Sequence, residues 1–212
     1  SVQMAAVGGA SIVEFLKLVY KLKSTNRTGW VHCKVRKPET IASHMWGVAL
    51  LSSIVVEPEI DRNKLIKLGL VHDVAECIAG DITPHDGISK EKKHQLEEEG
   101  MQQVQKTIGG ALGQEMYDLW CEYEDGITKE AKIVKQADKL DMIMQARIYE
   151  QEDPTLDLEG FFTSTKGYIT HPLLASVDST IRQERATKNS PPTQKPTPSD
   201  TLSPNRASSP DE

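Results

Sequence analysis

The chain has 212 residues, of which 38% are hydrophobic, and it carries a net charge of −6. This length fits one ordinary domain better than two, and the hydrophobic fraction is sufficient to build a core. The negative charge argues against a surface for polymeric nucleic acid, which is normally basic. No apolar run approaches the roughly 20 residues of a membrane span, so the composition also argues against a membrane protein.

Cysteine use and the N-terminal segment indicate the compartment. The three cysteines, Cys33, Cys77 and Cys121, are widely spaced and form no CxxC pair. This pattern favours buried thiols in a reducing compartment over a disulfide framework or a zinc ribbon. The first ten residues lack the basic and apolar regions of a secretory signal. We therefore expect an intracellular protein, located in the cytoplasm.

The composition divides the chain into three parts. From Ala186 onward the chain holds six of its eleven prolines and almost no apolar residue. Such a segment cannot bury enough apolar area to offset its chain entropy. We therefore expect a flexible N-terminus over residues 1–10, one folded domain over 11–185 and a disordered tail over 186–212.

The folded part is expected to consist of helices. Its apolar residues recur at helical spacing, and the expected helices span residues 11–23, 38–56, 61–80, 89–110, 112–125 and 128–151. Five of them begin with residues that commonly start helices: Ser11 with Glu14 as a capping box, Pro38, Asp61, Ser89 and Thr128. No convincing strand pattern and no solenoid repeat is present, so the sequence predicts an all-α bundle.

Charged residues interrupt the apolar stretch over residues 68–84. His72, Asp73, Glu76 and Asp81 lie within it, and burying their charges is costly unless another group compensates for them. In a continuous helix, Glu76 lies four residues after His72 and shares its face. Asp81 follows the expected helix end, from which the chain can turn back toward that face.

A second histidine and a further aspartate lie on other expected helices. His44 is flanked by apolar residues in the second helix, and Asp138 lies in the last one. Each residue has an ordinary alternative: His44 as a satisfied core histidine, Asp138 as an acid paired with a lysine, and Asp73 with Glu76 as a solvated helix face. Several acids and two histidines that converge in a core require a cation, which a divalent metal supplies.

The other polar and large apolar residues have simpler expected roles. We place the remaining histidines, His32, His85, His94 and His171, outside the site. Lys90 to Lys93 and Glu97 to Glu99 are expected to form a solvated charged face. The large apolar residues at helical spacing are expected in the core: Trp46, Trp120, Met142 and Met144.

The ordered set His44, His72-Asp73 and Asp138 resembles the HD-domain metal phosphohydrolase superfamily. Within it, longer segments are similar to the eukaryotic HD domain-containing protein 2 group and the bacterial YfbR-type 5′-deoxynucleotidases. These segments are "RTGWVHCKVRKPETIASHMWGVALL", "LVHDVAECIAGDITP", "EYEDGITKEAKIVKQADKLDMI" and "HP" at 171–172. The resemblance covers residues 11–182 and implies an HD-domain helical bundle.

The resemblance also implies an activity and a metal. It implies hydrolysis of 2′-deoxyribonucleoside 5′-monophosphates to deoxynucleoside and phosphate by a divalent-metal enzyme. The implied ligands of the first metal are His44, His72, Asp73 and Asp138. A second, looser metal is implied near Glu76, Asp81 and the carbonyl of Ile82. Nitrogen and oxygen ligands favour manganese, cobalt or magnesium and leave iron and zinc open.

The implied catalytic and substrate contacts complete the expected site. Glu76 is the candidate acid or water-orienting base, and Asp81 is expected to contact the sugar or assist proton transfer. Thr83 is expected close to the nucleoside. Trp30 matches a family tryptophan that penalises a 2′-hydroxyl, although ordinary core packing explains it equally well. The bacterial enzyme has an arginine directly before that tryptophan, where this chain has Gly29. The cation that binds the phosphate is therefore left open among the nearby Arg27, Lys34 and Arg36, of which Arg27 is the named candidate.

Two alternative functions are kept. One is another HD-type phosphohydrolase, acting on a cyclic nucleotide or a nucleoside triphosphate, although the short chain disfavours the triphosphate. The other is a non-enzymatic scaffold stabilised by a metal, against which the spare acids Glu76 and Asp81 argue. Deoxyribonucleoside 5′-monophosphates are the expected partners, with no nucleic-acid polymer and no membrane. The resemblance further implies a homodimer.

Overall fold

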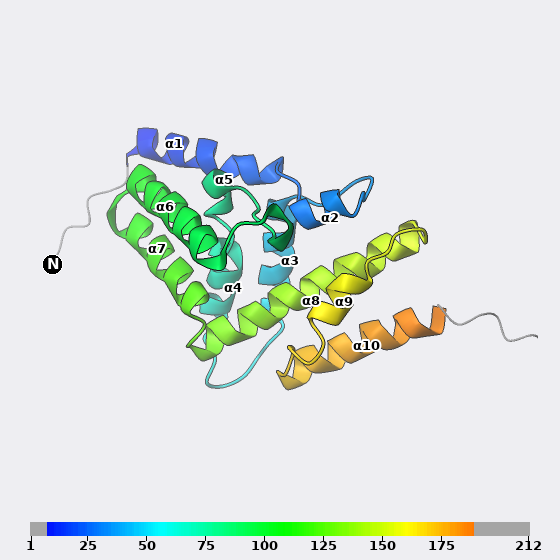
Figure 1. Cartoon of the computed structure of the whole chain (residues 1–212). Coiled ribbons are helices and arrows are strands. Elements are labelled where there is room, and N and C mark those ends of the chain that lie inside the picture. Colours follow the sequence, from blue (N-terminus) through cyan, green and yellow to red (C-terminus); the bar gives the residue numbers. More distant parts are fainter. Residues whose placement is uncertain (1–7, 189–212) are drawn as a thin grey trace, which may run out of the picture.

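The computed structural model describes residues 8–188, and in this range it contains helices and no strand (Figure 1). The α-helices are α1 (Gly9–Val19), α2 (Thr28–His32), α3 (Ile41–Ser53), α4 (Arg62–Val71), α5 (Glu76–Ala79), α6 (Lys90–Ile108), α7 (Gly110–Asp125), α8 (Lys129–Glu152), α9 (Glu159–Ser164) and α10 (Pro172–Lys188). Two short 3-10 helices are η1 (Tyr20–Lys23) and η2 (Pro84–Asp86). The expected all-α architecture is confirmed, and none of the helices in this range is long and apolar enough to cross a bilayer.

Three of the expected helix starts are confirmed because they depend on local hydrogen bonds. The Asp61 carboxylate accepts the amide N–H groups of Asn63 and Lys64, at 2.9 and 3.1 Å. Ser89 and Thr128 accept amide N–H groups of α6 and α8 in the same way. Each side chain satisfies a backbone donor that has no partner inside its helix.

Two other expected starts are wrong. The first helix begins at Gly9 rather than at Ser11, so Ser11 does not cap it. The second begins at Ile41 rather than at Pro38, because the Thr40 hydroxyl accepts the amide N–H of Ser43. The N-terminal boundary also shifts, since Gly9 and Ala10 belong to α1.

The helix expected over residues 61–80 is interrupted. Between α4 and α5, residues 72–75 form tight turns in which amide groups bond to the carbonyl three residues earlier, as Val74 does to Val71 at 3.0 Å. Each residue of such a turn advances further around the axis than in an α-helix. The expected uninterrupted helix over 61–80 is therefore wrong, although His72 and Glu76 still line the same cavity.

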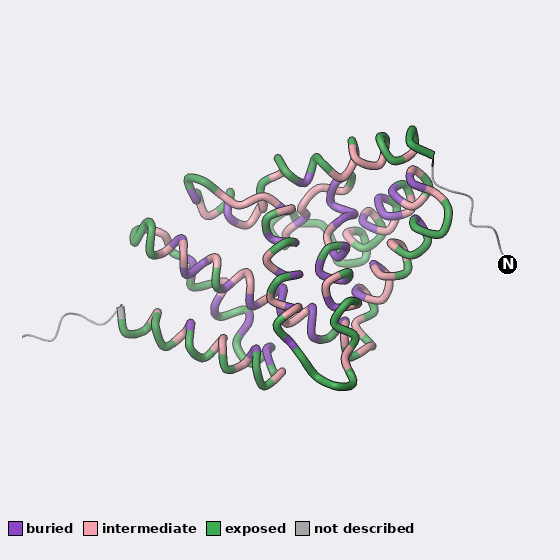
Figure 2. Tube along the Cα trace, turned by 180° about the vertical axis from the view of Figure 1, so that it is seen from behind, coloured by how far each residue is buried: buried purple, intermediate pink, exposed green. Residues whose placement is uncertain are grey.

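The buried apolar side chains form two clusters. One lies among α3, α4, α8, α9 and α10 and includes Val48, Leu68, Leu140, Phe162 and Leu174. The other lies among α1, α3, α4, α5, α6 and α7 and includes Ile41, Val71, Met101, Val104 and Trp120. In Figure 1, α8 runs diagonally between the group of α1, α6 and α7 and the pair α9 and α10. Figure 2 shows buried positions along the inward sides of these helices and exposed positions on their outer sides.

His44 and His72 lie where the two clusters meet along the chain. His44 is preceded by Ile41 of the second cluster and followed by Val48 of the first. His72 follows Leu68 of the first cluster and Val71 of the second. The seam between two apolar clusters is therefore where the polar site is built.

Several expectations on the periphery need correction. Trp46 and Met144 are 65% and 44% exposed rather than part of the core, whereas Trp120 is buried as expected. The sequence pattern did not identify α2, α9 or α10. Helix α10 continues to Lys188, beyond the expected domain end at 185. Residues 1–7 and 189–212, which include most of the expected tail, lie outside the described residues.

Candidate metal centre and active site

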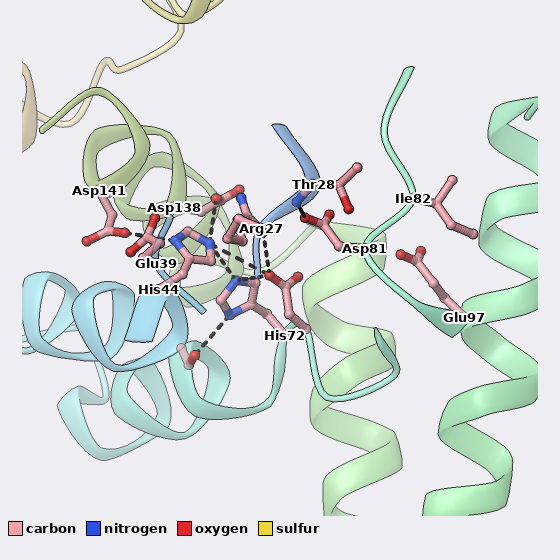
Figure 3. A network of polar contacts seen from close by, with 12 residues as sticks. Arg27, Thr28, Glu39, His44, His72, Asp81, Ile82, Glu97, Asp138 and Asp141 are labelled. Carbon is pink, nitrogen blue, oxygen red and sulfur yellow. Dashed lines mark hydrogen bonds and ion pairs between the residues drawn. The ribbon is translucent and has the colours of Figure 1, made fainter. Parts of the chain in front are cut away.

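The four expected ligands of the first metal come together in the structure, and Figure 3 labels three of them, His44, His72 and Asp138. The Nε2 atoms of His44 and His72 lie 3.4 Å apart. Asp138 Oδ1 lies 3.2 Å from His44 Nε2, and Asp73 Oδ2 lies 3.2 Å from His72 Nε2. These side chains come from α3, from the turn after α4 and from α8, so only the folded chain assembles them.

The second ring nitrogen of each histidine is already engaged. His72 Nδ1 lies 2.9 Å from the Gly69 carbonyl oxygen, which can only accept, so Nδ1 carries the proton. His44 Nδ1 lies 2.7 Å from Asp141 Oδ2. Both Nε2 atoms are therefore free to offer lone pairs on the side where the carboxylates of Asp73 and Asp138 lie. Two nitrogen acceptors and two carboxylates facing one another require a positive charge between them. Histidines that bind metals are held by such bonds from the other nitrogen.

A proton can supply that positive charge. Burial alone would lower the pKa of His44, but hydrogen bonds to Asp138 and Asp141 outweigh it and raise the pKa to about 9. Asp138 also accepts hydrogen bonds from Tyr123 Oη at 3.2 Å and Lys139 Nζ at 3.0 Å. The cluster is therefore compatible with a divalent cation, which would replace the proton of His44.

Arg27 reaches the same cluster. Its Nη1 donates to Asp73 Oδ2 at 3.1 Å. The arginine is positioned by the pairing of Asn26 with Thr40 and by its own amide N–H, which donates to the Glu39 carbonyl at 3.0 Å. Burial would raise the pKa of Asp73, but the charges of His72 and Arg27 hold it below its usual range. Arg27 therefore places a positive charge in the site, whereas position 29, an arginine in the bacterial enzyme, is a glycine here.

Glu76 and Asp81 extend the site away from the histidines. Glu76 is 4% exposed, and within the described residues its Oε2 atom has no hydrogen-bond partner. Burial and the neighbouring carboxylates of Asp73 and Asp81 raise the pKa of Glu76 well above its usual value. Asp81 Oδ2 accepts the amide N–H of Thr28 at 2.6 Å. The raised pKa favours the protonated form of Glu76 beside the Asp73 carboxylate.

A cavity of about 1000 Å³ opens over these residues. The four expected substrate contacts, Arg27, Trp30, Asp81 and Thr83, line it. Ile82 and side chains of α8 and α9, such as Lys139 and Phe161, line it as well. Nucleotide-sized ligands occupy cavities of this order.

Some residues placed outside the site by the sequence pattern also line the cavity. His85 and His94 do so, whereas His32 and His171 do not. The face with Lys93 and Glu97 is not fully solvated, because both residues line the cavity and Glu97 is only 8% exposed. The reason is that α6 approaches the turn at 72–75 closely.

Trp30 is both a core residue and a cavity residue. It is 2% exposed, and its ring lies 4.3 Å from that of Phe161 and 5.3 Å from that of Tyr149. Its Nε1 donates to Glu39 Oε1 at 2.9 Å. The indole is therefore fixed by packing and by a hydrogen bond.

Comparisons with known proteins agree with the geometry. The family model described as "HD domain" matches residues 19–175. The Homo sapiens protein named 5′-deoxynucleotidase HDDC2 is 42% identical over 181 residues, which cover 85% of this chain and 89% of that protein. The Schizosaccharomyces pombe protein named 5′-deoxynucleotidase hdd1 is 41% identical over 187 residues, which cover 86% and 94% of the two chains.

A solved structure has the same fold. The crystal structure of the PH0347 protein from Pyrococcus horikoshii OT3 is 29% identical and superposes with a TM-score of 0.66. It covers 81% of this chain, and 96% of that protein is matched. The resemblance seen in the sequence is confirmed: this chain belongs to the HD domain family.

Proposed function

We propose that this chain is a 5′-deoxynucleotidase, which hydrolyses 2′-deoxyribonucleoside 5′-monophosphates to deoxynucleoside and phosphate. The observation that carries the proposal is the cluster of His44, His72 and Asp138 acceptor atoms next to Arg27, at the base of a large cavity. The activity itself is taken from the names of relatives at about 40% identity over most of the chain.

We propose that His44, His72, Asp73 and Asp138 hold one divalent cation. Their nitrogen and oxygen atoms suit manganese, cobalt or magnesium, with iron and zinc as alternatives. When bound, such a cation supplies Lewis acidity and makes water a competent nucleophile near neutral pH. Tyr123 and Lys139 keep Asp138 oriented by donating to the oxygen that faces away from His44.

The other residues handle charge and protons on the substrate. Arg27 would bind the phosphate oxygens, since its guanidinium already lies in the cavity wall against Asp73. As water adds to phosphorus and the bond to the 5′ oxygen breaks, the leaving oxygen needs a proton. Glu76, whose raised pKa favours its protonated form, would donate it, a contribution of about 10²–10⁴-fold in rate. Asp81, held by the Thr28 amide, would orient the sugar.

The wall of the cavity would select the deoxy sugar. Trp30 is held in place by Glu39 and Phe161, so it cannot easily move aside. A 2′-hydroxyl pressed against an apolar ring finds no hydrogen-bond partner, which penalises ribonucleotides. Thr83 lines the same cavity and would lie close to the nucleoside.

Phosphate release from a panel of nucleotides, with and without Mn²⁺, tests the activity. We expect Mn²⁺-dependent turnover of deoxynucleoside 5′-monophosphates and weaker turnover of the ribonucleotides. Asp73→Asn should lose bound metal and activity with its helical circular dichroism intact. Glu76→Ala should keep the metal and lose rate.

The same panel separates the alternatives. Preferred turnover of a cyclic nucleotide or a nucleoside triphosphate would indicate a different phosphohydrolase of this family. Metal binding without any turnover would indicate the scaffold, and full activity of Glu76→Ala would remove Glu76 from the mechanism.

We also propose the homodimer that the family resemblance implies. An apolar strip on α3 and its C-cap residue supports it: Trp46, Leu50 and Ile54 recur every four residues and are 65%, 52% and 44% exposed. Exposed apolar strips of this kind commonly mark protein contacts. Sedimentation equilibrium would return the monomer mass if this assembly does not form.

A further inference from the structure

A lysine of α8 lies with Arg27 at the base of the cavity. Lys139 Nζ donates to Asp138 Oδ2 at 3.0 Å, and Arg27 Nη1 donates to Asp73 Oδ2 at 3.1 Å. Both cations line the cavity, and they come from distant parts of the chain, α8 and the segment before α2. Each of the two carboxylates of the proposed metal site therefore has a cation bonded to it.

The ammonium of Lys139 has hydrogen-bond donors to spare. A lysine ammonium is charged at neutral pH and offers three N–H donors. Within the described residues, Asp138 is the one hydrogen-bond partner of this ammonium. Because the side chain lines the cavity and is 39% exposed, the remaining donors can reach a ligand there.

Three other lysines that line the cavity are placed differently. Lys93 Nζ already donates to the Ile82 carbonyl at 2.9 Å. Lys135 of α8 places its ammonium 4.3 Å from the centre of the Tyr123 ring. Lys90 is exposed at the first residue of α6. Among the described residues, none of these three forms an ion pair with a proposed metal ligand.

A phosphate monoester needs more positive charge than Arg27 supplies. It carries about 1.5 to 2 negative charges at pH 7, spread over three acceptor oxygens. Arg27 brings one positive charge and shares it with Asp73. Lys34 and Arg36, the other candidates from the sequence, are exposed and lie outside the cavity lining. A second cation beside the same carboxylates would complete the charge balance of the bound phosphate.

We propose that Lys139 is a second phosphate-binding residue, which clamps the phosphate of the substrate together with Arg27. The inference rests on the proposed function, because it assigns a contact to the phosphate that this activity removes. One N–H of Lys139 stays on Asp138 while another donates to a phosphate oxygen. Arg27 binds a different oxygen through its remaining N–H groups. A single side chain thus supports a proposed metal ligand and binds substrate.

Removing the ammonium should weaken phosphate binding rather than metal binding. In Lys139→Met, we expect the affinity of the Mn²⁺-loaded chain for inorganic phosphate to fall by about 10–100-fold. KM should rise to a similar extent, with a smaller change in kcat. Mn²⁺ affinity should be retained, because Tyr123 still donates to Asp138 and a nearby positive charge is gone. Lys139→Arg keeps the charge and should bind phosphate more tightly than Lys139→Met.

The experiment uses the full chain, loaded with Mn²⁺ and freed of excess metal. Calorimetric titration with inorganic phosphate measures phosphate binding, and titration of the metal-free chain with Mn²⁺ measures metal binding. Circular dichroism verifies the fold. Lys135→Met is the matched control, since it removes another cavity-lining ammonium one turn away on α8. Its phosphate affinity should stay close to that of wild type.

The outcomes separate this inference from the proposed function. If Lys139→Met binds phosphate as tightly as wild type, or if Lys135→Met loses as much affinity, the phosphate contact of Lys139 is refuted. A lower Mn²⁺ affinity with unchanged phosphate binding would show that Lys139 only positions Asp138.

Two further results complete the test. Wild type that binds Mn²⁺ and phosphate but hydrolyses no nucleotide would refute the proposed function, while the titrations would still decide the role of Lys139. If wild type binds neither Mn²⁺ nor phosphate, both proposals fail. If Lys139→Met does not fold, Lys139→Gln decides, because it keeps a donor for Asp138 without the charge.

Discussion

Asp141 fixes the ring of His44, although the ligand pattern in the sequence does not include it. Its Oδ2 lies 2.7 Å from His44 Nδ1, and Glu39 lies close to both residues. Gly47 makes this contact feasible, because a Cβ atom at that position would overlap Asp141 Oδ1. The orientation of the His44 ring thus depends on the Asp141 carboxylate and on the lack of a side chain at Gly47.

Replacing Asp141 should therefore weaken metal binding without unfolding the chain. We expect Asp141→Asn to reduce Mn²⁺ affinity by about 10–100-fold, as is typical for residues that orient metal ligands. Gly47→Ala should act in the same direction by displacing the carboxylate. Calorimetric titration measures the affinity, with Lys132→Met on the exposed side of α8 as the control. Unchanged affinity in Asp141→Asn would show that the His44 ring is fixed by its packing alone.

The proposed ligands could be identified from the sequence, but their supporting residues could not. His44, His72, Asp73 and Asp138 stand out because charged side chains occur among apolar ones. Asp141 has a weak signal, since it lies three residues after Asp138 and so faces the same way. Lys93 and Glu97 have none: in a helix rich in charge they look solvated, and only the approach of α6 to the turn at 72–75 buries them.

The close crossing of α3 and α4 brings the two histidines together. At Gly69, a Cβ atom would lie 2.7 Å from the Cα atom of Ala49, so the helices touch through their backbones. The Gly69 carbonyl also accepts the hydrogen bond of His72 Nδ1. The same glycine therefore sets the distance between the helices and the orientation of one ring.

Gly69→Ala should harm stability and metal binding together. Because neither backbone can yield without moving its helix, we expect a loss of about 1–3 kcal/mol in the free energy of unfolding. Mn²⁺ affinity should fall as well, since His72 moves with α4. Gly9→Ala in α1 is the control, because nothing lies within 4 Å of its added methyl group. Urea unfolding and metal titration measure the two effects, and a fully stable Gly69→Ala protein with normal affinity would contradict the expected crossing.

Helix starts could be predicted where a single side chain caps the helix. Helix ends inside the core could not be predicted. Asp61, Ser89 and Thr128 bond to amides two or three residues away, so their role is visible in the sequence. The break at 72–75 depends on packing against α3 and α6, which the sequence pattern does not contain. The short helices α2 and α9 each span fewer than two full turns and show no usable periodicity.

For the molecule as a whole, protonation and metal binding would compete at His44 if it is a ligand as proposed. A histidine whose folded pKa is raised, here from 6.5 to about 9, stabilises the fold fully below pH 6.5 and loses this contribution as the pH rises through 9. A bound cation replaces the proton and removes that dependence. Metal-free protein should therefore lose stability across this window, whereas metal-loaded protein should lose less.

Thermal unfolding in chelator and in Mn²⁺ from pH 6.5 to 8.5 measures this difference. We expect the increase in Tm on adding Mn²⁺ to grow with pH. At a Mn²⁺ concentration 100 times its dissociation constant, the added stabilisation approaches about 2.7 kcal/mol. Groups away from the site contribute equally to both curves and cancel in the difference. A gain in Tm that is constant or that shrinks toward pH 8.5 would contradict the link between His44 and the metal.

The positions of the proposed ligands along the chain also determine when the proposed metal site can form. His44 and His72 leave the ribosome early, but Asp138 follows only after α6 and α7 have been made. Until α8 docks, a nascent chain presents only His44, His72 and Asp73, without Asp138 and the side of the site that α8 forms. Assembly of the proposed four-ligand site therefore requires synthesis and docking of α8.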